Sequence, residues 1–134
     1  MSIHQEVTFA ASPERLYELL TDGGKFAAAT GMPAEIEAAA GTSFSLFGGR
    51  AEGRHIELVP GGRVAQAWRL SDWESGVYSM VRFTLTPAGD GTKIALDVED
   101  YPEGSSPLFP TWHEHLSTGW PMFYWEPFAR YLAN

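Results

Sequence analysis

The feature that most constrains the fold is a run of alternating apolar and polar residues between Ala34 and Asp100. Turns rich in glycine, such as Pro60-Gly61-Gly62, interrupt it at the spacing of β-hairpins. Alternation places every second side chain on one face of a strand, and such turns reverse the chain between antiparallel neighbours. The pattern predicts six strands in an antiparallel meander, near residues 34–39, 42–47, 50–59, 63–70, 77–86 and 92–100.

The residues before this run predict one further strand and two short helices. Segment 3–9 alternates apolar and polar residues, so we expect a strand with one buried face. Ser12-Pro13 supplies a helix N-cap followed by proline at the first helical position, which predicts a helix over 12–20. A second short helix is expected over 25–29.

The C-terminal segment combines many aromatic rings with two prolines. Its apolar residues recur at roughly helical spacing, at Trp112, Leu116, Trp120, Phe123 and Tyr131. We therefore expect one long helix over 111–132, preceded by a proline-rich loop at 101–110. Pro121 and Pro127 are expected to bend this helix, because proline lacks the N–H group of a helical hydrogen bond.

Together these elements predict an α+β fold in the order β-α-α-β6-α. A curved, seven-stranded antiparallel sheet would wrap around the long C-terminal helix, with the two short helices after the first strand. A chain of 134 residues needs a single core, and no linker or repeat divides it. Residues 1–134 are therefore expected to form one domain.

Composition limits the partners and the compartment. The formal charge of −8, with nine scattered Lys and Arg residues, argues against nucleic acid and anionic membrane as partners. The chain has no cysteine, which excludes disulfides and thiolate metal sites. No secretory signal is visible at the N-terminus, so we expect a cytoplasmic protein.

Polar residues interrupt the apolar faces of the predicted sheet, at Gln5, Gln66, Ser79 and Asp100. A few convergent polar groups in apolar surroundings are typical of a ligand pocket, although such groups also bond to one another or lie at strand ends. We expect a cavity between sheet and helix to bind a hydrophobic or aromatic small molecule, without a cofactor. The candidate ligand-binding residues are Gln66, Trp68, Ser79, Phe83, His113, Leu116, Trp120, Phe123 and Tyr124.

Two histidines are the weak candidates for catalysis. His113 and His115 are two residues apart, which places them on opposite sides of a helix and prevents them from chelating one metal ion. Either could contact a ligand or act as a general base. His55 and Glu57 share a strand face, but two ligands do not make a metal site, so no metal is expected. Nucleophile-elbow, phosphate-loop and dinucleotide-binding motifs are absent from the sequence.

The rings of the C-terminal segment spread around the helix, so they cannot all face one groove. One interpretation places most of them in the core. Another places Trp120, Phe123 and Tyr124 in the cavity wall, and a third uses Trp125 and Phe128 as a homodimer patch.

Several short strings carry a family resemblance: Phe47-Gly48-Gly49 with Gly53, Glu57-Leu58-Val59-Pro60-Gly61, Val64-Ala65-Gln66-Ala67-Trp68-Arg69, Thr92-Lys93-Ile94-Ala95-Leu96 and Gly119-Trp120-Pro121. Jointly they resemble the helix-grip, or START-like (SRPBCC), superfamily. Within it, they are similar to the branch homologous to the C-terminal domain of the Hsp90 ATPase activator. The resemblance extends over nearly the whole chain.

The resemblance implies the helix-grip fold. The branch includes many small bacterial proteins without assigned activity, beside ligand-binding and cyclase-like relatives in the wider superfamily. Three functions stay open on this basis: a small-molecule binder, a cyclase-like or hydrolase-like enzyme with a pocket histidine, and a protein-interaction module that is homodimeric or chaperone-associated. Eukaryotic activators carry a separate N-terminal domain, which this chain is not expected to contain.

Overall fold

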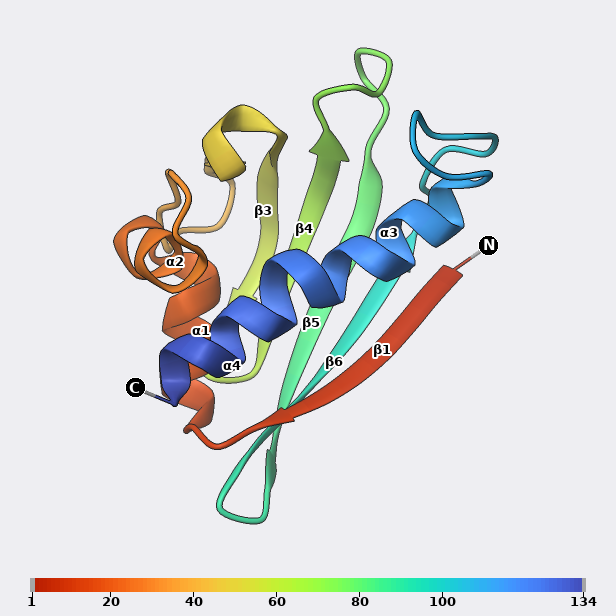
Figure 1. Cartoon of the computed structure of the whole chain (residues 1–134). Coiled ribbons are helices and arrows are strands. Elements are labelled where there is room, and N and C mark those ends of the chain that lie inside the picture. The colour runs from red at the N-terminus through yellow and green to blue at the C-terminus, as the bar shows by residue number, and fades with distance from the viewer. Residues whose placement is uncertain (1, 134) are drawn as a thin grey trace.

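The computed structural model describes residues 2–133 and has an α+β architecture (Figure 1). The elements follow in the order β1 (Ser2–Phe9), α1 (Pro13–Thr21), α2 (Gly23–Thr30), β2 (Ser43–Leu46), η1 (Phe47–Gly49), β3 (Ala51–Val59), β4 (Arg63–Leu70), β5 (Ser79–Ala88), β6 (Gly91–Glu99), α3 (Trp112–Trp120), η2 (Pro121–Trp125) and α4 (Glu126–Leu132). The strands form one antiparallel sheet in the order β1-β6-β5-β4-β3-β2. Among the described residues no helix is both long and apolar enough to cross a bilayer.

The sheet described within residues 2–133 has six strands, so the prediction of seven was wrong. The predicted strand at 34–39 makes a single antiparallel bridge, between Glu35 and Ser45. That pair exchanges both backbone hydrogen bonds, but the next carbonyl on the same side, on Glu37, accepts from the N–H of Ala39 instead. The ladder therefore stops after one residue pair, because the chain turns away from β2 at Glu37. On the opposite side, the carbonyl of Ile36 accepts from the N–H of Gly23 at the start of α2.

The two short helices were predicted correctly, and both owe their starts to side-chain caps. The Ser12 hydroxyl oxygen accepts a hydrogen bond from the backbone N–H of Arg15 at 3.1 Å, and Pro13 occupies the first helical turn. At α2 a carboxylate oxygen of Asp22 accepts from the N–H of Lys25 at 3.0 Å. These acceptors satisfy amide groups that a helix start otherwise leaves unpaired.

A bulge in β3 separates two residues that the sequence placed on one face. The register against β4 shifts between His55 and Glu57, so that Ile56 is the extra residue. His55 is 1% exposed, whereas Glu57 is exposed and pairs with Arg63. The expectation that His55 and Glu57 share a face was therefore wrong.

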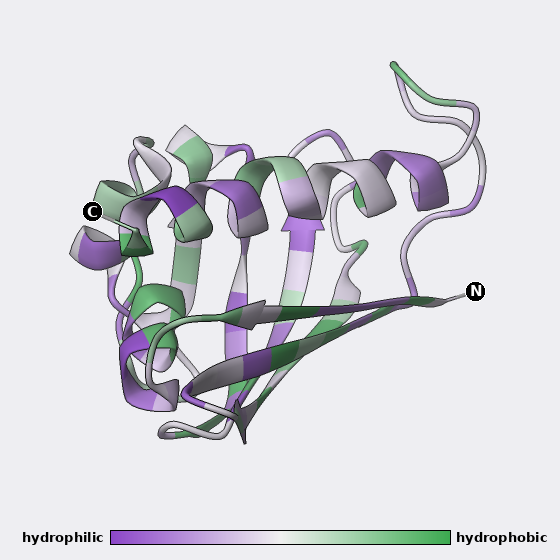
Figure 2. Ribbon diagram, turned by 60° about the horizontal axis from the view of Figure 1, so that its bottom comes forward, coloured by the Kyte–Doolittle hydropathy of each residue, from purple (hydrophilic) through white to green (hydrophobic). Residues whose placement is uncertain are grey.

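The C-terminal segment is one helical column that lies over one face of the sheet, as Figures 1 and 2 show. A π-helical turn, η2, joins α3 to α4, and the N–H of Glu126 donates to the carbonyl of Pro121. Pro121 has helical angles, with φ −59° and ψ −44°. The wider turn lies directly before Pro127, where a regular α-helix would press the proline ring against a carbonyl oxygen.

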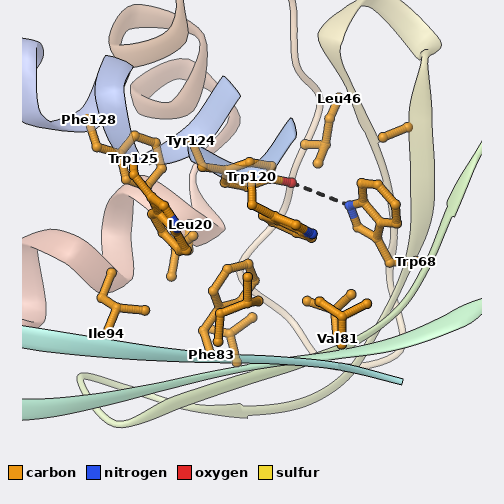
Figure 3. Packing of buried hydrophobic residues seen from close by; sticks show 14 of the residues in the cluster. Leu20, Leu46, Trp68, Val81, Phe83, Ile94, Trp120, Tyr124, Trp125 and Phe128 are labelled. Carbon is orange, nitrogen blue, oxygen red and sulfur yellow. Dashed lines mark hydrogen bonds between the residues drawn. The ribbon is translucent and has the colours of Figure 1, made fainter. Parts of the chain in front are cut away.

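The core lies between the sheet and the helices, and Figure 3 shows Phe83 and Ile94 of the sheet directed toward the C-terminal rings. Trp125 and Phe128 are part of this core, at 5% and 0% exposure. They cannot form a dimer patch, so that version of the homodimer hypothesis was wrong. Both residues contact Phe9, on β1, which is why this side of the helix is covered.

Candidate functional site

A groove of about 560 Å³ lies between the C-terminal helical column and one end of the sheet. Its walls come from α3, η2, β4, the η1 turn and the loop before α3, and they are mostly apolar. The lining residues are Met32, Phe47, Arg50, Trp68, Leu70, Ser71, Asp72, Pro107, Leu108, Phe109, His115, Leu116, Thr118, Gly119, Trp120, Met122, Phe123 and Tyr124. The groove has the size and character of a small-molecule site.

Three aromatic side chains from three elements, β4, α3 and η2, meet at the groove. The indole N–H of Trp68 donates a hydrogen bond to the hydroxyl oxygen of Tyr124 at 3.3 Å (Figure 3). The ring of Trp120 lies 5.3 Å from that of Trp68 and 4.2 Å from that of Tyr124. Burial raises the pKa of Tyr124 well above its ordinary value, so this hydroxyl stays protonated. These contacts join the three rings in the groove wall.

The structure brings five of the nine predicted ligand-binding residues into this groove: Trp68, Leu116, Trp120, Phe123 and Tyr124. His115, a candidate for catalysis, also lines it. Phe83 lies beneath it, fully buried against the rings of Trp120 and Tyr124. His113 lies outside the groove lining and packs near the ring of Tyr101, at 6.1 Å between ring centres.

The polar interruptions of the sheet have separate local explanations. Gln5 donates to the carbonyl of Ser117 and accepts from the indole of Trp125, which joins β1 to the helical column. The Ser79 hydroxyl donates to the carbonyl of Trp68 at 2.8 Å. Both side chains are therefore engaged within the fold, and neither lines the groove.

Gln66 and Asp100 complete this set. Asp100 is exposed at the end of β6, with φ +63°. Gln66 is buried beside His55 in the β3–β4 register, and its carbonyl oxygen has no hydrogen-bond partner within residues 2–133. Gln66 is therefore a buried residue that does not line the groove.

Sequence reasoning missed most of the groove rim, because those residues lie on turns and loops without periodicity. The segment 107–109 and the pair Ser71 and Asp72 belong to this group. Gly119 leaves space in the groove, because a Cβ atom built there would meet only the side chain of Phe123, at 3.9 Å.

The η1 turn is the one strained segment of the groove wall. Phe47, Gly48 and Gly49 have φ values of +54°, +67° and +96°. Glycine adopts this region freely, whereas a phenylalanine does so at an energetic cost. The ring of Phe47 is held by Phe26 and Tyr124, at 5.4 Å and 5.5 Å between ring centres. The Phe-Gly-Gly string was the sequence signal for this turn.

Arg69 fixes the loop that supplies Ser71 and Asp72. Its side chain is buried on the outer side of the sheet and donates to the carbonyl of Trp73 at 2.6 Å. It also forms a salt bridge with Glu52 at 2.6 Å. The loop therefore has a fixed position relative to β3 and β4.

His115 is the histidine that faces the groove. Its ring packs against Trp112 and Phe109, at 4.8 Å and 5.3 Å between ring centres. Burial lowers the pKa of His115, although the charge of Asp72 acts in the opposite direction. Its Nδ1 atom has no hydrogen-bond partner in the described part of the chain. His115 is therefore a neutral imidazole at neutral pH, without a carboxylate bonded to that nitrogen.

No group of three or more His, Asp or Glu side chains within residues 2–133 is arranged to hold a metal ion. On the outer face of the sheet, His4 hydrogen-bonds Asp97 and Glu6 at 2.7 Å and 2.8 Å. The hydrogen bond to Asp97, and then that to Glu6, raises the pKa of His4.

The buried His55 makes stability depend on pH. Burial lowers its pKa below the ordinary value of 6.5, so the unfolded chain binds a proton more readily than the folded one. We expect the free energy of unfolding to fall as the pH is lowered from about 7.5 to about 5.5. Urea denaturation of the protein and of His55→Leu at both pH values measures this, and the variant should show a smaller decrease.

His4 supplies the internal control for this prediction, because its shift has the opposite sign. A raised pKa stabilises the fold below the unfolded value and loses that contribution as the pH rises. His4→Gln should therefore show a larger acid-induced decrease than the unchanged protein. Equal pH dependence in His55→Leu and the unchanged protein would contradict the assignment to His55.

The fold and the groove define a class: a small α+β protein in which a C-terminal helical column and an antiparallel sheet enclose an apolar groove. The family model described as "Activator of Hsp90 ATPase homolog 1-like protein" matches residues 10–133. The chain belongs to this family, as the sequence strings predicted.

Curated relatives share this region. The mouse activator of 90 kDa heat shock protein ATPase homolog 1 is 29% identical over 119 residues, which is 89% of this chain and 33% of the relative. The homologous activator of Dictyostelium discoideum is 36% identical over 81 residues, or 60% of this chain and 21% of the relative. This chain spans a third or less of the length of these relatives.

Solved structures agree on the fold. An Hsp90 activator from Plasmodium falciparum has a TM-score of 0.85 at 24% identity, covering 94% of this chain and 91% of the other. The Aha1 dimer from Colwellia psychrerythraea has a TM-score of 0.77 at 19% identity, covering 94% and 92%. At these identities the likeness establishes the fold alone.

Proposed function

We propose that this protein binds a small, largely apolar aromatic molecule in the groove between the C-terminal helical column and the sheet. The observation that carries the proposal is the groove itself, because its volume of about 560 Å³ is within the roughly 300–1,000 Å³ of small-molecule sites. We also propose that the sheet curves around the helix in a helix-grip fold, that residues 1–134 form a single domain, and that the protein is cytoplasmic.

Exposed apolar side chains at the groove support this function. Phe123 is 39% exposed and Met122 is 53% exposed, both on the η2 turn, while Leu108 on the facing loop is 81% exposed. A bound aromatic molecule would remove part of this surface from water, which contributes about 25 cal/mol for each Å² of apolar area. The ring of Phe47 also lines the groove, where an aromatic ligand could pack against its edge or its face.

Gly119 provides a direct test, because a larger side chain there fills the groove without touching the core. We expect Gly119→Leu to weaken binding of prodan, a neutral naphthalene dye, by about tenfold or more through steric exclusion. Gly119→Ala should keep most of the binding. Both variants should fold at least as stably, because glycine in a helix interior costs roughly 0.5–1 kcal/mol relative to alanine. Dye emission titrations measure affinity, and urea denaturation measures stability.

The pair of variants separates the groove from general surface binding. If the dye bound elsewhere on the surface, both Gly119→Leu and Gly119→Ala would change its affinity only slightly and by similar amounts. Equal dye affinity of Gly119→Leu and the unchanged protein, or no saturable blue shift with any of them, would refute the proposal.

A protein-interaction role is the second candidate function. The motivating observation is the same exposed rim of Leu108, Met122 and Phe123, because large exposed apolar patches mark association sites. Relatives include an Hsp90 activator and an Aha1 dimer. Light scattering over a range of concentrations tests self-association, and the ATPase rate of Hsp90 with and without this protein tests the chaperone version. If the protein stays monomeric at all concentrations and leaves the ATPase rate of Hsp90 unchanged, both versions are rejected.

The enzyme hypothesis has weaker support. His115 lines the groove and is neutral, as a general base should be, yet its buried nitrogen has no carboxylate partner among the residues described.

A further inference from the structure

The groove contains one cation without a partner, Arg50. The guanidinium lines the groove and, within residues 2–133, makes no hydrogen bond or ion pair. Arg63 and Arg69, by contrast, form ion pairs with Glu57 and Glu52. An unpaired arginine beside an apolar wall is a binding group for an anion, because its planar fork matches two carboxylate oxygens.

The remaining polar groups of the groove are mainly hydrogen-bond donors. Trp120 has a buried indole N–H without a partner in the described chain, and a neutral His115 carries one ring N–H. Ser71 and Thr118 add hydroxyl groups at the rim. A ligand that supplies acceptor oxygens would satisfy these donors, whereas a hydrocarbon would leave the Trp120 N–H unpaired. Asp72 is the single carboxylate in the lining.

The strained η1 turn brings two different groups into the lining of the groove. Phe47 contributes its ring, and Arg50, the residue directly after the turn, contributes a positive charge. Backbone strain persists where the surrounding structure holds it, and it concentrates at ligand sites. The turn therefore has a role that packing alone does not require: it contributes both an aromatic ring and a cation to the lining of the groove.

From these observations we infer that the natural ligand is an aromatic carboxylate, whose ring system occupies the apolar groove and whose carboxylate binds the guanidinium of Arg50. This inference rests on the proposed function and names its ligand class. The overall charge of −8 repels anions at long range, so recognition depends on the short-range contact with Arg50. A cationic ligand in the same place would be repelled by the positive charge of Arg50.

Competition against bound prodan tests the inference with two nearly isosteric compounds, 2-naphthoate and the neutral 2-naphthamide. At about pH 7.5 the carboxylate is ionised, and we expect it to displace the dye about tenfold more effectively than the amide. Arg50→Gln should abolish this preference and leave displacement by the amide unchanged. Asp72→Asn should increase the affinity for 2-naphthoate, because it removes a like charge.

Arg82→Gln is the matched control, because Arg82 is exposed on β5 and lies outside the groove lining. It removes the same charge and should keep the preference for the carboxylate. Equal displacement by the two compounds, or a preference that survives in Arg50→Gln, would overturn the inference while the dye still binds. Failure of the dye to bind at all would instead reject the proposed function.

Discussion

Replacing Gly53 with alanine is expected to lower the free energy of unfolding by about 3 kcal/mol or more, because the new methyl group has no space. A Cβ atom at this position overlaps the carbonyl oxygen of Ala67 on the neighbouring strand and lies 2.7 Å from Cζ of Phe44. The carbonyl belongs to the β3–β4 ladder, which cannot move without breaking hydrogen bonds. Thermal and urea denaturation measure the loss.

Gly76→Ala is the control for Gly53→Ala. Gly76 has φ +86° and no atom within 4 Å of an added Cβ, so its substitution costs only the conformational strain of about 1–2 kcal/mol. A loss for Gly53→Ala no larger than that for Gly76→Ala would show that the strands separate easily at this point, contrary to the structure.

Phe26→Ala is the second substitution with a large expected effect, about 3–5 kcal/mol of stability. Phe26 lies on α2, almost fully buried, and its ring contacts those of Phe47, Tyr124 and Phe128. Removal leaves a cavity where α2, the η1 turn and the helical column meet. Phe47 then loses one support of its strained backbone, so dye affinity of the folded fraction should fall as well. Urea denaturation and dye titration measure the two effects.

The matched control for Phe26→Ala is Phe123→Ala. Phe123 is 39% exposed and contacts the ring of Phe47 from the solvent side. Its removal should cost less than that of Phe26, about 1–2 kcal/mol in stability, because a larger part of its surface already lies in water. Similar stability losses for the two substitutions would contradict the assignment of Phe26 to the core junction.

The family match and the groove fall on the same part of the chain. The family match covers residues 10–133, and the groove is built from elements throughout that range. Ligand occupancy would change the exposed apolar surface at Phe123 and Met122, which is also the surface available to a protein partner. The dye and light-scattering experiments therefore report on one surface.

Much of the secondary structure could be predicted because its signals are local. Strand alternation and the caps at Ser12 and Asp22 depend only on neighbouring residues. The failures came from contacts between distant residues. The segment at 34–39 bonds to β2 through Glu35 and to the start of α2 through Ile36, and the β3 bulge turns His55 inward and Glu57 outward. Neither event has a signature within its own segment.

For the candidate site, the sequence alone determined which aromatic residues the C-terminal helix carries and that they face apolar strands. The tertiary structure decided which rings remain available: Trp125 and Phe128 are covered by Phe9, whereas Phe123 borders open space. It also brought Arg50 to the same groove. The physical reason is that helical and strand periodicity assigns a face to each side chain, but burial depends on what other parts of the chain cover that face.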